Sequence, residues 1–60
     1  MYSLHVDWNN HIVVINVPSF RYANHFLARQ DLKYINRAWF YKDYQLKATY
    51  KILPDGFEVI

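Results

Sequence analysis

The sequence predicts an α+β fold, a small antiparallel β-sheet with one helix packed on one face, in the order ββαβββ. Three observations support this prediction. Residues 2–8 and 11–17 alternate as strands do and flank an Asn-Asn turn. Residues 20–30 contain no proline, glycine or β-branched residue, which favours a helix. After residue 34, short apolar stretches separated by turn residues indicate further strands.

The first two strands form a hairpin whose register the sequence predicts. Asn9 and Asn10 separate them, and asparagine tolerates the left-handed backbone of a tight two-residue turn. Such a turn places Trp8 opposite His11 and Leu4 opposite Ile15. In this register both strands contribute to one apolar face, which consists of Tyr2, Leu4, Val6, Val13, Ile15 and Val17.

A helix is predicted from Phe20 to about Gln30, and its continuation to Tyr34 is left open. Pro18 ends the second strand because it has no N–H to donate, and Ser19 is a suitable N-cap. The helical spacing gives one apolar stripe, formed by Phe20, Ala23 and Leu27, beside an aromatic pair at Tyr22 and Phe26.

Three further strands are expected after the helix. Residues 38–41 suit a strand, followed by a turn at residues 42–43 or 43–44. Residues 45–53 alternate, which predicts one apolar face made of Leu46, Ala48, Tyr50 and Ile52. Pro54–Gly56 predicts a turn, because proline presets its first central residue, and residues 57–60 form the last strand.

The chain is short enough to be one domain, residues 1–60, with a core that depends on its aromatic residues. A domain of this size buries only about 60% of the surface exposed by its unfolded chain. Cysteine is absent and aromatic residues make up 20% of the chain, so the rings are interpreted first as core. The predicted buried residues are Leu4, Val6, Val13, Ile15, Leu27, Trp39 and Tyr50.

The location expected from the sequence is the cytoplasm, or the host cytoplasm for a viral protein. The longest apolar run, Ile12–Ile15, is far shorter than the roughly 20 residues of a membrane span. The first ten residues have neither a basic region nor a long apolar stretch, so no secretory signal is expected. A chain without cysteine also fits a reducing compartment.

The sequence predicts neither a metal site, a cofactor nor an enzymatic activity. The hairpin register puts His5 and His11 on opposite faces, and His25 lies on the helix, so the three cannot share an ion. Ser3 lies on a predicted strand and Ser19 at a predicted helix cap, so a structural role explains each serine. The five acids form no evident catalytic pair, and a single glycine cannot build a phosphate loop.

The segment from Leu32 to Lys51 mixes aromatic rings with cations and is the remaining candidate for function. All seven Lys and Arg lie between Arg21 and Lys51. This longer range contains two acids, so its net charge is +5. The structural interpretation is that its rings are core and its lysines protect sheet edges. A nucleic-acid surface is the alternative function, using Lys33, Arg37, Lys42, Lys47 and Lys51.

The preferred interpretation is a small protein-binding module without enzymatic activity. Hydrophobic residues make up 53% of the chain, more than one helix and a short sheet are expected to hide. Ile12 and Val14, opposite Asp7 and His5, are also too apolar for a water-facing strand. The expected partner-binding residues are Arg37, Tyr41, Lys42 and Tyr44. The module would be a subunit, a self-associating protein, or an inhibitor of a host protein made by a virus or mobile element.

Overall fold

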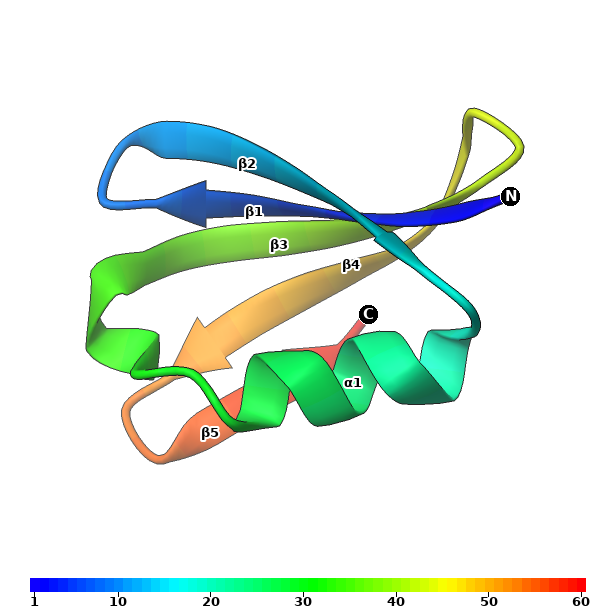
Figure 1. The fold of residues 1–60 in the computed structure, drawn as a ribbon. Coiled ribbons are helices and arrows are strands. Elements are labelled where there is room, and N and C mark those ends of the chain that lie inside the picture. The colour runs from blue at the N-terminus through cyan, green and yellow to red at the C-terminus, as the bar shows by residue number, and fades with distance from the viewer.

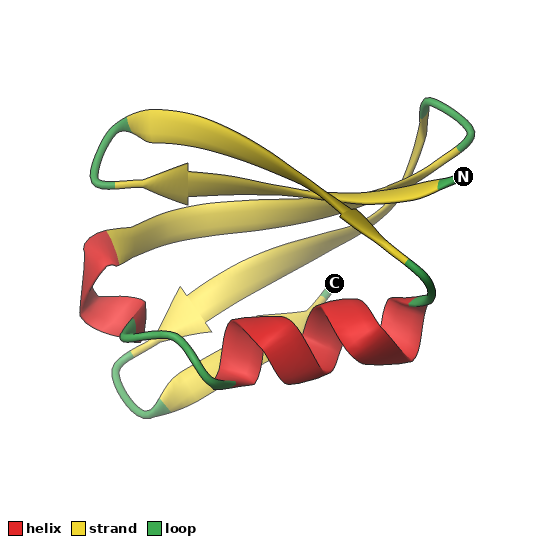
Figure 2. Cartoon of the chain, in the orientation of Figure 1, coloured by secondary structure: helices red, strands yellow, loops and turns green.

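A computed structural model describes residues 1–60 as one five-stranded antiparallel sheet with one α-helix on one face (Figure 1). The elements are β1 (Tyr2–Trp8), β2 (His11–Val17), α1 (Phe20–Ala28), a 3₁₀ helix η1 (Leu32–Tyr34), β3 (Ile35–Lys42), β4 (Gln45–Leu53) and β5 (Gly56–Val59). The strands lie in the order β2-β1-β3-β4-β5. Short turns join β1 to β2, β3 to β4 and β4 to β5, whereas α1 and η1 connect β2 to β3 (Figure 2). This confirms the predicted α+β fold and its ββαβββ order. The single α-helix is too short to cross a membrane.

The β1–β2 hairpin has the predicted register throughout. Trp8 pairs with His11, Leu4 with Ile15 and Tyr2 with Val17. Asn9 and Asn10 have φ angles of 51° and 70°, the left-handed conformation that a tight hairpin turn needs. The turn residues and the alternation of the strands therefore specify the same register.

Replacing Asn10 with glycine is expected to change the free energy of unfolding by less than about 0.5 kcal/mol, because glycine adopts positive φ without strain. It also removes an exposed hydrogen bond, in which Asn36 Nδ2 donates to Asn10 Oδ1 at 3.1 Å. Asn10→Ala should instead cost about 1 kcal/mol, since alanine resists this conformation. Urea denaturation of both variants tests the turn, and equal stability of the two would contradict a left-handed Asn10.

The helix α1 begins as predicted and ends two residues early. The Ser19 hydroxyl accepts a hydrogen bond from the Tyr22 N–H at 3.0 Å. At the other end, the N–H groups of Arg29 and Gln30 bond to carbonyls three residues earlier, which tightens and closes the last turn. Asp31 then caps η1 by accepting from the Lys33 N–H. The continuation to Tyr34, which the sequence leaves open, is a separate 3₁₀ turn.

The core lies between α1 and the sheet and consists of nine buried residues. They are Leu4, Val6, Val17, Ala23, Leu27, Ile35, Ala38, Phe40 and Tyr50. Four of the seven predicted core residues are among them, and each of these four is fully buried: Leu4, Val6, Leu27 and Tyr50. The Tyr50 hydroxyl donates a short hydrogen bond to Asn24 Oδ1 on α1, which satisfies the polar end of this ring.

The other three predicted core residues are not fully buried, and the reasons differ. Val13 is exposed and Ile15 is half-buried because β2 is an edge strand, with β1 on one side and no strand on the other. Trp39 is half-buried because it lies on the opposite face of the sheet. Its register partner is His5, whereas the neighbouring Ala38 and Phe40 face the core.

A bulge in β4 makes one prediction wrong: Leu46 does not share a face with Ala48, Tyr50 and Ile52. Phe40 pairs with Ala48 and Tyr41 with Leu46, so Lys47 is one residue more than β3 can match. Because side chains alternate along a strand, this insertion moves Leu46 to the face opposite Ala48, Tyr50 and Ile52. The preceding turn uses the second of the two predicted positions, Asp43-Tyr44, with φ angles of 49° and 68°.

Candidate functional site: the open face of the sheet

The face of the sheet away from α1 is covered by no other element, and we call it the open face. The strand registers place three rows of side chains across it. The first row is Ile12, Asp7, Arg37, Lys51 and Glu58. The second is Val14, His5, Trp39 and Thr49, and the third is Asn16, Ser3, Tyr41 and Leu46. Ile60 extends the second row, because its backbone pairs with Thr49 through two hydrogen bonds of 2.8 and 3.4 Å.

Aromatic rings occupy the centre of the open face. Trp39 and Tyr41 project from β3, and His5 projects from β1 as the register partner of Trp39. The rings of His5 and Tyr41 lie 4.2 Å apart, centre to centre, at an angle of 42°. Ser3 Oγ and His5 Nε2 share a hydrogen bond of 3.1 Å, which fixes the imidazole against its own strand. All three residues are half-buried.

Exposed aliphatic side chains surround these rings. Ile12 is 59% exposed, Val14 57%, Leu46 52% and Ile60 70%. A solvated face of an antiparallel sheet normally carries polar residues, so this apolar content is unusual. Contiguous exposed apolar surface with a polar border typically marks an interaction site.

The first row supplies the charges of the open face. Asp7, Arg37, Lys51 and Glu58 follow one another across four strands, so their formal charges cancel. Arg37 and Lys51 are direct register partners, an arrangement of like charges that disfavours pairing. Neither has an ion-pair partner within 4.0 Å, and Asp7 Oδ1 is shielded from solvent without any hydrogen bond. The two cations are therefore free to receive an anionic group.

The four expected partner-binding residues are divided between two faces and a turn. Arg37 and Tyr41 lie on the open face, beside Trp39. Tyr44 is almost fully exposed in the β3–β4 turn. Lys42 lies on the α1 side, where its Nζ is 5.7 Å from the centre of the Tyr2 ring.

The five residues of the alternative nucleic-acid set also do not form one surface. Arg37 and Lys51 are neighbours on the open face, whereas Lys42 lies on the α1 side. Lys33 is on η1, where it pairs with Asp31 at 3.7 Å. Lys47 is the unmatched residue of the β4 bulge.

Sequence reasoning did not include Trp39 or His5 in a site. The run Ala38–Tyr41 is apolar at every position, so alternation could not separate its two faces. A usable signal came from the first hairpin, whose register places Ile12 and Val14 with His5 on the face away from the core. Trp39 joins that face through its pairing with His5.

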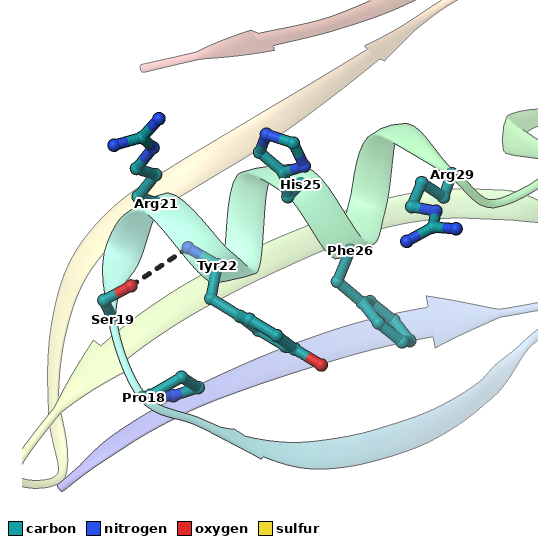
Figure 3. A pocket seen from close by; sticks show the side chains of 7 residues that line it. All are labelled: Pro18, Ser19, Arg21, Tyr22, His25, Phe26 and Arg29. Carbon is teal, nitrogen blue, oxygen red and sulfur yellow. Dashed lines mark hydrogen bonds between the residues drawn. The ribbon is translucent and has the colours of Figure 1, made fainter.

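A second feature is a shallow groove of about 360 Å³ beside α1. It is lined by Pro18, Ser19, Arg21, Tyr22, His25, Phe26 and Arg29 (Figure 3). Tyr22, Phe26 and Arg29 extend to one side of the helix, whereas Arg21 and His25 extend to the other. The cations of the groove therefore do not converge on one point, and the groove is a weaker candidate than the open face.

No group of three or more histidine or acidic side chains lies close enough to hold a metal ion. Comparison of the chain with protein-family models, curated proteins and solved structures finds no match. The physical character of the open face therefore carries the functional argument.

Proposed function

We propose that this chain is a non-enzymatic protein-binding module that covers a partner protein with its open face. The observation that carries this proposal is an uncovered sheet face with Trp39 and Tyr41 at its centre and exposed aliphatic residues around them. Tyr, Trp and Arg are the residue types that dominate interface hot spots, and hot spots lie within a surrounding ring of contacts. The open face has both properties.

The charges indicate the chemistry of the partner surface. Arg37 and Lys51 lie side by side without ion-pair partners. A carboxylate on the partner, set above these two cations, would relieve their mutual repulsion and accept their hydrogen bonds. The partner surface is thus a flat apolar patch bordered by an Asp or Glu.

The side chains of the open face support binding better than catalysis. Ser3 and His5 share a hydrogen bond, the first requirement of an activated nucleophile. Asp7 Oδ1 bonds to no polar atom, so it does not orient His5 as the third member of a triad would. The pair also lies on an open sheet surface, without the concave pocket that holds a small substrate.

A single-stranded nucleic acid is the second candidate ligand. His5, Trp39 and Tyr41 lie on the two adjacent strands β1 and β3, and bases stack on such rings in small sheet domains. Arg37 and Lys51 would contact phosphates. Asp7 and Glu58 lie in the same row and cancel this charge, which is the reason for preferring a protein.

The test compares capture of proteins by the immobilised chain and its variants from a cell lysate, with and without nuclease. Trp39→Ala should weaken capture by about 30-fold, the equivalent of a 2 kcal/mol hot spot. The triple variant with Arg37, Tyr41 and Tyr44 changed to alanine should also lose binding and keep the fold. Tyr22→Ala, an exposed ring on α1, is the matched control and should bind as the wild type does.

Thermal unfolding of each variant separates loss of binding from loss of structure. Unchanged capture by a folded Trp39→Ala variant would show that the open face is not the binding surface. Capture that disappears with nuclease would favour the nucleic acid instead. In that case, affinity for a labelled single-stranded oligonucleotide should fall about sevenfold between 50 and 200 mM salt, the loss expected when two cations, Arg37 and Lys51, contact phosphates of a single strand.

A further inference from the structure

The outer edge of β2 has backbone groups without partners. β2 is the terminal strand of the sheet, and none of the backbone hydrogen bonds outside the helices and strand ladders involves it. A two-residue turn makes Trp8 and His11 a hydrogen-bonded pair, and such pairs alternate along the hairpin. The N–H and C=O groups that point away from β1 therefore belong to Ile12, Val14 and Asn16.

β2 also lacks the features that protect an edge strand from pairing. It is seven residues long, carries no lysine, arginine, acidic residue or proline, and pairs with β1 without a bulge. Ile12, Val13 and Val14 are all exposed. The other edge, β5, has four residues including Glu58. Long, apolar and uncharged edges are templates for another strand.

We propose that β2 pairs in antiparallel fashion with β2 of a second copy of this chain, joining two sheets into one. The outward-pointing groups are spaced symmetrically about Val14. A two-fold axis at Val14 therefore places Val14 opposite the partner's Val14, and Ile12 opposite the partner's Asn16. Each of these pairs can exchange both N–H···O bonds, so every unpaired group of the edge is satisfied.

The chemistry of β2 favours a second copy as the occupant. A two-fold interface sets a surface against itself, so a charge at or beside Val14 would meet a like charge at the axis. β2 has none. The two-fold axis is perpendicular to the sheet, so both α1 helices lie on one side and the two open faces become continuous. The pairing rests on β2 alone; only this doubling of the binding surface rests on the proposed function.

The first test is the mass of the full chain by sedimentation equilibrium, from micromolar to millimolar concentration. The wild type should form dimers, and Val14→Pro should weaken dimerisation at least tenfold, because it removes an outward N–H and leaves the β1 ladder intact. Val59→Pro is the matched control. It removes an outward N–H from the β5 edge, since Ile60 is the next residue bonded to Thr49, and it should dimerise as the wild type does.

Two further variants keep the test decisive where a proline prevents folding. Val14→Lys retains the N–H and sets like charges together at the axis, so it should be monomeric at low salt, whereas Val59→Lys should dimerise. Val14→Cys places two thiols opposite each other in a chain that otherwise lacks cysteine. A short bismaleimide should join Val14→Cys at least tenfold faster than Ile12→Cys, because Ile12 does not face its own copy.

The outcomes separate this inference from the proposed function. A wild type that stays monomeric at every concentration overturns the edge pairing, even if it captures a protein through Trp39. A dimer that survives both Val14→Pro and Val14→Lys, or that is lost in Trp39→Ala, also overturns it and assigns self-association to another surface. A Trp39→Ala variant that dimerises supports the edge pairing, whatever its capture of other proteins.

Discussion

In urea denaturation, Leu27→Ala is expected to lower the free energy of unfolding by about 2–5 kcal/mol. Leu27 is fully buried and is the large aliphatic residue of α1 in the core. Its removal leaves a cavity between α1 and the sheet that the neighbouring side chains cannot fill without moving. Domains of this size have little stability to lose, so this variant can be largely unfolded at room temperature.

The matched control is Leu46→Ala, which makes the same chemical change on the open face. Leu46 is more than half exposed, so we expect a cost below about 0.5 kcal/mol. A similar loss of unfolding free energy in both variants would contradict the difference in burial between Leu27 and Leu46. A loss below about 0.5 kcal/mol for Leu27→Ala would mean that α1 does not pack on the sheet.

The second large effect is an alkaline loss of stability caused by Tyr50. Burial raises the pKa of Tyr50 to about 12 from its usual 10.0. Above pH 10 the phenol ionises in the unfolded chain but stays protonated in the folded protein, so the folded state binds one more proton. Its stability contribution is therefore complete below pH 10 and falls by roughly 1 kcal/mol per pH unit up to about pH 12.

Denaturation curves of wild type and Tyr50→Phe at several values between pH 8 and 12 measure this effect. Tyr50→Phe should be about 0.5–1.5 kcal/mol less stable at pH 8, because it loses the hydrogen bond to Asn24. It should also lose the alkaline decline that Tyr50 causes. Tyr44→Phe, at an exposed tyrosine, should retain the decline. An equal decline in all three proteins would assign it to other groups.

Local patterns were sufficient for the parts of the fold that local residues decide. The register of the first hairpin follows from Asn9-Asn10 and the alternation of its strands. The start of α1 follows from Pro18 and Ser19. In each case neighbouring residues and the final packing favour the same conformation.

Features that depend on distant pairing could not be predicted in this way. Trp39 was expected in the core, but the face it occupies is set by its pairing with His5, far away in the sequence. Leu46 was assigned to the core face because alternation takes no account of an inserted residue, and Lys47 is that residue. The shift of face is hidden in this sequence because Leu46 is apolar although it lies on the open face.

The candidate site was predicted only in part, again because the pairing of distant strands could not be predicted. The mixture of rings and cations after residue 32 identified Arg37 and Tyr41, which do share the open face. It could not show that Lys33 and Lys42 lie elsewhere. Lys42 follows Tyr41 on β3 and therefore points to the opposite face, and Lys33 lies on η1, before the strand begins. His5 contributes to the same surface from β1, outside the segment from Leu32 to Lys51.

The strand β1 lies between β2, its neighbour in the chain, and β3, whose paired residues are 27 to 40 positions away. The β1–β2 and β3–β4 hairpins close over two-residue turns, an event that takes roughly 1–10 μs. Joining β1 to β3 must instead close a long loop that contains α1, and the entropy of closure is lost before the contacts form. We therefore expect two preformed halves, tethered by the helix, whose encounter limits the rate of folding.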